Sequence, residues 1–199
     1  MVYVKHLSSD LAMIPVNKCE VLRYMGAKAS TDELDRLVCE CIAETVGAIS
    51  AKLCFAEYAL AINGSSVDLE FCKVESNDLA KNLSGCNRAV VFAATVGIGL
   101  DRLIAKYSRL SPARALCVGA IGNERVEALC DLFCKELKDK YKKTHPRYSA
   151  GYGDLDLSVQ RDVFKALGCT QNIGISLSDS LLMTPTKSVT AIVGIESGD

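Results

Sequence analysis

Apolar residues recur every three or four positions in several stretches of the chain, which is the spacing of one helix face. The clearest stretch runs from Thr31 to Ser50, and Ser30 and Glu33 form an S-x-x-E capping box at its start. A longer helix is predicted from Ser111-Pro112 towards Lys140, with serine as N-cap and proline in the first turn. Three shorter helices are predicted at 77–83, after Gly99 to about 107, and at 158–167, with Ser76 and Ser158 capping the first and the last.

Other stretches have the pattern of β-strands. Residues 54–63 and 67–74 alternate, and Asn63-Gly64 between them predicts a hairpin because both residues tolerate a positive φ. Residues 88–95 are almost continuously apolar, as in a buried strand. Two further strands are predicted at 172–177 and 189–195, joined through Met183-Thr184-Pro185. No linker or repeat divides the chain, so we predict one α+β domain over 1–199, an antiparallel sheet with helices packed against it.

Composition and charge narrow the class of protein. The 199 residues are 49% apolar and 24% charged, which is ordinary globular usage and argues against disorder. With 23 basic and 24 acidic residues the net charge is −1, so a general nucleic-acid binder is disfavoured. No apolar run approaches the roughly 20 residues that span a bilayer, and residues 1–10 lack a signal-peptide core. We therefore expect a cytoplasmic protein that binds neither nucleic acid nor membrane.

Ten cysteines are many for a chain without a signal peptide. A reducing compartment favours free thiols over disulfides. The sequence contains no C-x-x-C and only two histidines, His6 and His145, so a metal or cluster site is the less favoured alternative. Cys130 and Cys134 share one face of the long helix. We expect most of these thiols to be buried and unreactive, packing as small hydrophobic side chains.

Two other features have a structural and a functional interpretation. The turn Gly97-Ile98-Gly99 joins a strand to a helix, as a phosphate-binding turn does, but it lacks the third glycine of G-x-G-x-x-G, which favours tight packing. Glycines at 119 and 122 likewise indicate close packing or a kink in the long helix. The basic residues near its end complement a helix C-terminus, with a phosphate or partner patch as the alternative; they are Lys135, Lys138, Lys140, Lys142 and Lys143.

The loop at 147–157 is the most informative stretch. It combines an arginine, two tyrosines and two carboxylates with two glycines. Arginine offers a fork for a carboxylate or phosphate, tyrosine a flat face with a hydroxyl, and glycine lets backbone amides approach a ligand. This combination suits a zwitterionic or nucleoside ligand. The alternative is a polar turn in which Arg147 pairs with Asp154 or Asp156.

At these residues the chain resembles a known family. The run R-Y-S-A-G-Y-G-D-L-D-L at 147–157, Gln160, and I-G-I-S-L-S-D-S-L-L-M-T-P-T-K-S-V-T-A-I-V-G-I at 173–195 look like the activation domain of cobalamin-dependent methionine synthase. They look most like the stand-alone proteins of that type. Three earlier segments fit as well: E-V-L-R-Y-M-G at 20–26, A-A-T-V-G at 93–97, and the helix around Glu124 and Glu127.

The resemblance implies a C-shaped α+β domain with a twisted antiparallel sheet and a shallow groove for S-adenosylmethionine. It implies an accessory activation subunit that docks onto a corrinoid protein, whose cobalamin is carried by that partner. When cobalt has oxidised to the inactive cob(II) state, a flavodoxin or ferredoxin supplies one electron and S-adenosylmethionine supplies the methyl group. The chain itself would provide no metal ligand and no catalytic side chain.

The resemblance also assigns roles to individual residues. Arg147 meets the carboxylate of S-adenosylmethionine, the backbone of Ala150 and Gly151 lines the adenosyl site, Tyr152 stands between the two cofactors, and Glu127 lies near the amine. The fused domain has a further N-terminal aspartate for that amine, with no secure counterpart here, and a tyrosine-bearing tail beyond the point that corresponds to Asp199. We therefore expect the affinity for S-adenosylmethionine to be weak or absent.

Two other classes of function stay open at this point. One is a corrinoid-protein binding or scaffold module without methyl transfer. The other is a small methyltransferase that acts on a different acceptor, which ranks last because the sequence has no recognisable Rossmann-type glycine loop.

Overall fold

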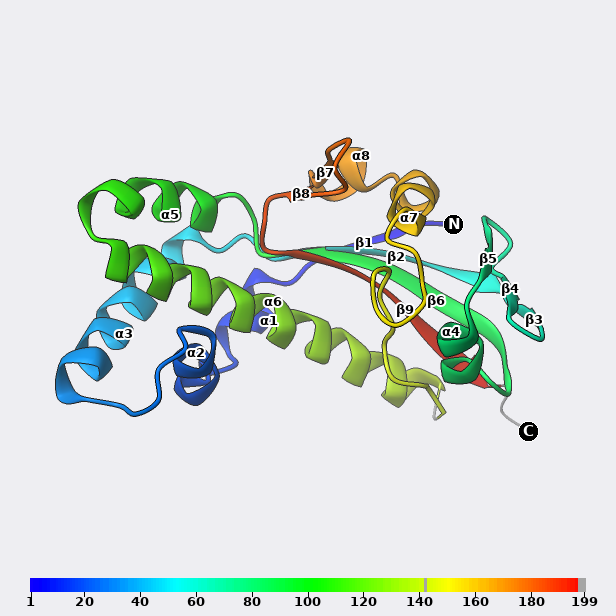
Figure 1. Cartoon of the computed structure of the whole chain (residues 1–199), viewed down its shortest axis with the longest axis horizontal. Helices are drawn as coiled ribbons and strands as arrows, with labels where there is room; N and C mark the ends of the chain where they lie inside the picture. The colour runs from blue at the N-terminus through cyan, green and yellow to red at the C-terminus, as the bar shows by residue number, and fades with distance from the viewer. Residues whose placement is uncertain (142, 197–199) are drawn as a thin grey trace.

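A four-stranded antiparallel sheet forms the centre of the computed structural model, which describes residues 1–141 and 143–196. The strand order is β1-β2-β6-β9. Figure 1 shows the sheet as a twisted ribbon with α6 along one side and α7 and α8 on the other. The strands are β1 (Tyr3–His6), β2 (Lys52–Ala59), β6 (Cys86–Thr95) and β9 (Ser188–Glu196). The predicted α+β class with an antiparallel sheet is confirmed.

Strand β6 is buried on both of its faces, which explains the apolar run in the sequence. Val90, Phe92 and Ala94 point into a core shared with α6, whereas Ala89, Val91 and Ala93 point into a second core under α7 and α8. All six are 0% exposed. Since alternate residues of a strand face opposite sides, burial on both sides removes the polar positions that a half-exposed strand would carry.

The first core lies between the sheet and the helices of one layer. The main helix of this layer is α6, which continues without a break through Gly119 and Gly122. Gly122 is closely packed, since a Cβ there would lie 2.8 Å from Lys187 Cγ. Figure 1 shows α3, α5 and the start of α6 extending beyond the end of the sheet. The elements of this layer are α1 (Ser8–Ala12), α2 (Lys18–Tyr24), α3 (Asp32–Thr45), the 3-10 turn η1 (Val46–Ala48), α5 (Gly99–Leu110) and α6 (Pro112–Tyr141).

The second core lies on the opposite face of the sheet. Leu69, Leu79, Leu167 and Ile175 are fully buried there, against the outward side of β2 and β6. Small elements cover this face: β3 (Ala61–Asn63), β4 (Ser66–Asp68), β5 (Lys73–Glu75), α4 (Asn77–Asn82), α7 (Val159–Leu167), α8 (Cys169–Ile173), β7 (Ser176–Leu177) and β8 (Met183–Thr184). The strands β3-β4-β5 form one small sheet, and β7-β8 another.

Local sequence signals identify some boundaries correctly and others wrongly. The hairpin is confirmed, since Asn63 pairs with Ser66, and so is Ser76 as N-cap, since its side chain accepts a hydrogen bond from Leu79 N at 3.0 Å. The capping box is wrong: Thr31, rather than Ser30, accepts from Leu34 N and caps α3. Ser158 does occupy the predicted N-cap position of α7, but its side chain makes no capping hydrogen bond.

Two predicted strands are broken by turns. The segment at 54–63 divides at Leu60 between the main sheet and the small sheet, so it forms β2 and β3. The segment at 172–177 begins as the end of helix α8 and becomes strand only at Ser176. Gly174 ends that helix in the left-handed conformation, with φ of 73°, so the strand cannot start before it.

The glycine turn at 97–99 serves packing, as expected. A Cβ on Gly99 would collide with the carbonyl oxygen of Ala48, and one on Gly97 would lie 3.0 Å from Ser50 Cβ. The backbone there is joined by Ser50 N donating to Val96 O at 2.9 Å. Glycine is therefore needed because the turn closes against the backbone that follows η1.

Most cysteines are buried or half-buried. Cys41, Cys54, Cys117, Cys130 and Cys169 are buried, whereas Cys19 and Cys39 are exposed. Burial raises the pKa of the Cys117 thiol to about 12, which keeps it protonated at neutral pH. Within residues 1–141 and 143–196, no cluster of three or more His, Cys, Asp or Glu side chains is arranged to hold a metal ion. None of the helices in that part of the chain combines the length and hydropathy of a membrane crossing.

Candidate functional site

The loop between α6 and α7 is tied to the edge of the main sheet. Tyr148 N donates to Ile192 O and Ile192 N donates to Tyr148 O, both at 2.8 Å, and a second bridge joins Thr144 to Ile195. The loop therefore runs as a short extra strand beside β9. This pairing fixes Arg147 between the sheet and the exposed side of α6. Lys142, which belongs to the predicted basic cluster, lies outside the described residues.

The tip of the loop is a tight turn that only glycine fits at one position. Gly151 N donates to Leu155 O at 2.9 Å, and Leu155 N donates to Tyr152 O at 3.0 Å. Gly153 has a φ of 53°, and a Cβ there would lie 2.5 Å from the hydroxyl of Tyr148. The absence of that Cβ lets the Tyr148 hydroxyl donate to Tyr152 O at 3.1 Å, which supports the turn that carries Tyr152.

Asp154 fastens this turn to helix α4. Its carboxylate accepts hydrogen bonds from Ser76 Oγ, from Asn77 N at 2.8 Å and from Asp78 N at 3.2 Å. The Ser76 hydroxyl and then the helix amides lower the pKa of Asp154 to about 2. Asp156 instead accepts from Ser158 N at 2.7 Å, where α7 begins. Both carboxylates are thus occupied at helix starts, and the predicted alternative in which either one pairs with Arg147 is wrong.

Arg147 pairs with two carboxylates of α6 instead. Its Nη2 donates to Glu127 Oε2 and its Nη1 to Asp131 Oδ1, each at 2.5 Å. Burial by itself lowers the pKa of Arg147, but the hydrogen bond to Asp131 and the surrounding negative charges outweigh that effect and raise the pKa. The guanidinium is about a quarter exposed and Asp131 is 71% exposed, so this cluster lies open to solvent at one side.

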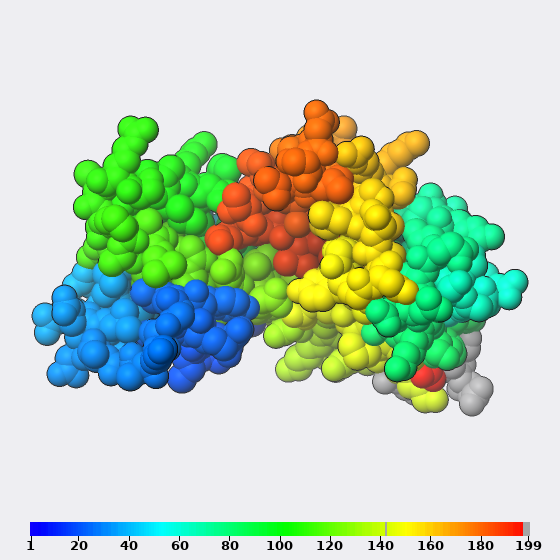
Figure 2. All heavy atoms as spheres, in the orientation of Figure 1, coloured from blue at the N-terminus to red at the C-terminus, as the bar shows by residue number. Residues whose placement is uncertain are grey.

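A cavity of about 420 Å³ opens beside this cluster. That volume lies within the range of small-molecule sites, about 300–1,000 Å³. Figure 2 shows the lining segments meeting in the middle of one face, where the yellow loop, the orange-red end of the chain around β8 and β9, and the yellow-green part of α6 come together. The lining residues are Glu127, Arg147, Tyr148, Ser149, Ala150, Tyr152, Gln160, Met183, Ser188, Val189 and Thr190.

The structure brings together four of the five residues to which the sequence assigns a ligand. Glu127, Arg147, Ala150 and Tyr152 all line the cavity, and Tyr152 is 68% exposed at its mouth. Gly151 lies in the adjoining turn, with its Cβ position directed at Leu157 rather than at the cavity. The cavity lining thus combines an acid and a base with aromatic, apolar and neutral polar side chains, which suits a zwitterion joined to a flat ring system.

Comparison with known proteins places the chain in a family. The family described as vitamin B12 dependent methionine synthase, activation domain, matches residues 76–197, which is more than half of the chain. The chain belongs to this family. The matched part contains every residue that lines the cavity. The expected resemblance is therefore confirmed.

A solved structure supports the same fold for this activation-domain family member. The structure is described as the MetH reactivation domain bound to AdoHcy, and it is similar with a TM-score of 0.71 and 11% sequence identity. The similarity covers 100% of this chain and 79% of the other. At that identity the match establishes the fold alone. No curated protein sequence matches the chain significantly.

Several residues of this activation-domain site have no role predicted from the sequence, among them Asp131 and Gln160. Asp131 accepts a hydrogen bond from Arg147. It lies four residues after Glu127 on α6, and this spacing predicts that the two carboxylates share one face of the helix. Gln160 is quoted above for the resemblance, but no role is assigned to it. Its place in the cavity wall depends on how α7 packs, which no local pattern in the sequence specifies.

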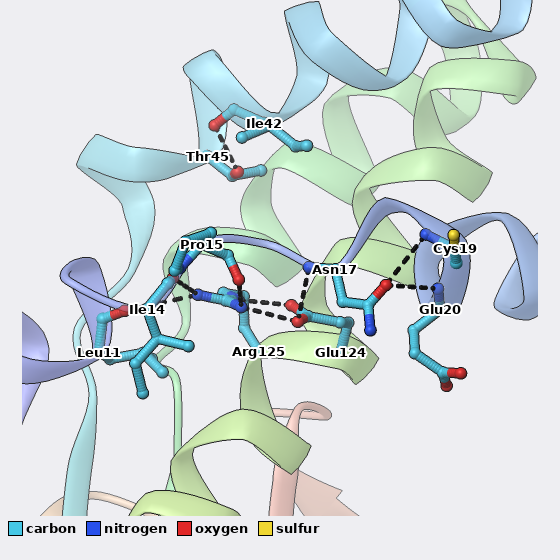
Figure 3. A network of polar contacts seen from close by, with 10 residues as sticks. All are labelled: Leu11, Ile14, Pro15, Asn17, Cys19, Glu20, Ile42, Thr45, Glu124 and Arg125. Carbon is cyan, nitrogen blue, oxygen red and sulfur yellow. Dashed lines mark hydrogen bonds and ion pairs between the residues drawn. The ribbon is translucent and has the colours of Figure 1, made fainter.

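A buried ion pair holds the N-terminal segment against α6 one turn before Glu127. Figure 3 shows Arg125 Nε and Nη2 donating to Glu124, and the same guanidinium donating to Ile14 O at 2.7 Å and to Pro15 O at 3.1 Å. Glu124 also accepts from Asn17 N at 3.0 Å. This network anchors the chain between α1 and α2 beside the middle of α6.

Proposed function

We propose that this chain binds S-adenosylmethionine in the cavity and supports the reductive remethylation of a cobalamin-dependent methionine synthase or a related corrinoid protein. Its membership in the activation-domain family supports the partner class, and the AdoHcy bound in the similar structure supports the ligand class. The observation that carries the proposal is that one cavity holds Arg147 and Glu127 together with the exposed Tyr152. We further propose that residues 1–199 act as one activation unit in the cytoplasm.

The charged end of the cavity is suited to an amino-acid head group. Arg147 and Glu127 now bond to each other, and an α-amino carboxylate offers each a replacement partner. The ligand carboxylate accepts from the Arg147 fork while its ammonium group donates to Glu127, so one ion pair is exchanged for two. Asp131 competes with the ligand for Arg147, which is a physical reason to expect modest affinity.

The rest of the ligand lies along the loop. The small side chain of Ala150 and the neighbouring backbone leave room for the adenosyl group, and Tyr148, Met183 and Val189 supply flat or apolar surface. Tyr152 stands at the mouth, where its ring is free to contact the partner. Cobalamin on that partner would supply the cobalt that accepts the methyl group once a flavodoxin or ferredoxin has supplied one electron, and S-adenosylhomocysteine would be left in the cavity. The residues of this chain hold and orient the methyl donor.

The rival function is a corrinoid-protein binding module without methyl transfer. One observation favours it, namely that Arg147 is already paired with two carboxylates in the structure. The two functions differ in ligand binding, because only the first requires S-adenosylmethionine or its product to enter the cavity.

Calorimetry with S-adenosylhomocysteine separates these functions. We expect the wild type to bind and Arg147→Ala to lose about ten- to a hundredfold in affinity, because a charge-assisted bidentate pair is removed. Arg102→Ala is the matched control, since Arg102 is exposed on α5 away from the lining residues. The absence of wild-type binding at millimolar ligand refutes the cofactor role. Remethylation of a cob(II)alamin-loaded partner with an electron donor then tests the activity itself.

A further inference from the structure

Gln160 lines the cavity, and its buried side chain carries a polar atom without a hydrogen-bond partner among the described residues. The residue is 6% exposed, and its Oε1 has no hydrogen-bond partner among the described residues. Buried polar atoms are nearly always paired, since leaving one unpaired costs free energy. A buried amide that lines a cavity and lacks a protein partner is the arrangement expected of a group whose partner is a ligand.

The backbone around Gln160 explains why its side chain is held there. Gln160 N donates to Leu157 O at 3.1 Å, and Asp156 caps the preceding turn. Val159 and Val163 on the same helix are buried in the second core, which fixes the rotation of α7. The side chain is therefore set by the packing of its neighbours rather than by a capping bond of its own.

The chemistry of the carboxamide restricts which part of a ligand it recognises. The group is neutral and offers one acceptor beside two donors. Rotation about its broad χ3 torsion turns either atom towards the cavity. The charged head group is already matched by Arg147 and Glu127, so Gln160 is left for a neutral partner that presents a donor beside an acceptor. The N6 and N7 edge of adenine has this pattern, and glutamine pairs with it through two hydrogen bonds.

We propose that Gln160 recognises the adenine ring of the bound ligand, with Oε1 accepting from the exocyclic amine and Nε2 donating to N7. This inference rests on the proposed function, because that function places the head group of the ligand on Arg147. Gln160 is then a specificity-determining residue that distinguishes adenosyl from inosyl ligands. In the inosyl ring O6 and N7 are both acceptors, so one amide cannot satisfy the pair.

Calorimetry with S-adenosylhomocysteine and S-inosylhomocysteine tests the assignment. We expect the wild type to prefer the adenosyl ligand by about 5- to 150-fold, the discrimination of a bidentate base contact. Gln160→Met is expected to lose this preference, with weaker adenosyl binding and unchanged inosyl binding. Gln160→Leu serves as a second variant of different shape. Gln171→Met is the control, because Gln171 is exposed on α8 and does not line the cavity.

The stability of the same variants gives an independent readout. Because the unpaired amide is replaced by apolar atoms, Gln160→Met is expected to raise the midpoint of thermal unfolding of the unliganded protein while it weakens adenosyl binding. A variant that keeps the full adenosyl preference overturns the assignment, as does a wild type that binds both ligands equally; in the latter case the proposed function stands. A wild type that binds neither ligand contradicts the proposed function as well.

Discussion

Replacing Arg125 with methionine is expected to destabilise the fold far more than replacing both members of its ion pair together. The guanidinium is 3% exposed, and it donates to both oxygens of Glu124 and to the carbonyls of Ile14 and Pro15. The single change leaves the Glu124 carboxylate buried, with Asn17 N as its remaining partner. Breaking a buried pair in this way costs about 3–5 kcal/mol, because an uncompensated charge stays inside the protein.

That cost is large on the scale of protein stability. The free energy of unfolding of a typical domain is about 5–15 kcal/mol, so the variant loses a substantial fraction of its stability. For a chain of this length each kcal/mol of lost stability lowers the midpoint of thermal unfolding by about 2–4 °C, so the expected fall is about 6–20 °C. The double change Glu124→Leu with Arg125→Met removes both charges, and its cost is expected to be smaller than that of Arg125→Met alone.

Urea unfolding at 25 °C and thermal unfolding, both followed by circular dichroism, measure these differences. Arg102→Met is the matched control and should lie within about 0.5 kcal/mol of the wild type, because Arg102 is exposed. The reasoning fails if Arg125→Met costs less than about 1 kcal/mol, or if the double variant is less stable than the single one.

Three further predictions concern the loop and its contacts. Asp131→Asn should tighten binding of S-adenosylhomocysteine by up to about fivefold in calorimetry. The change removes an exposed ion pair that holds Arg147 away from the ligand with a free energy of about 0.2–1 kcal/mol. Unchanged or weaker binding contradicts this prediction. Tyr152→Ala should shift stability by no more than about 0.5 kcal/mol, since the ring is 68% exposed, yet abolish remethylation of the partner; a stable variant with wild-type remethylation excludes the docking role. Asp154 has a pKa lowered from 3.8 to about 2, so its stabilising effect is complete above pH 4 and is lost as the pH falls towards 2. Asp154→Asn should therefore be less stable than the wild type at pH 7 in urea unfolding, with the gap closing below pH 4; a gap that is the same at pH 2 and pH 7 argues against this role.

Features decided by neighbouring residues could be predicted from the sequence. The apolar run at 88–95 indicates a strand buried on both faces, and Asn63-Gly64 indicates a hairpin. Ser76 is the correct cap of α4 because a serine before a short helix satisfies an amide three residues ahead. The motif around Arg147 located the cavity, since its residues are adjacent in the chain and share one loop.

Features decided by distant contacts could not be predicted in this way. The partners of Arg147 lie 16 and 20 residues earlier on α6, whereas the local alternatives in the sequence are Asp154 and Asp156. What settles the pairing is that Asp154 accepts from two backbone amides at the start of α4, 76 and 77 residues away in the chain. Similarly, a strand is predicted at 172–177, but its first two residues belong to α8, whose Cys169 and Ile173 pack in the second core.

The lining of the cavity is confined to one part of the chain. Each lining residue lies between Glu127 and Thr190, whereas the first 75 residues contribute β1 and β2 of the main sheet, the small sheet β3-β4-β5 and helices α1 to α3. Substitutions in the first 75 residues can therefore change the outer surface of the fold without replacing any side chain of the cavity lining, whereas substitutions between Glu127 and Thr190 can change the lining itself.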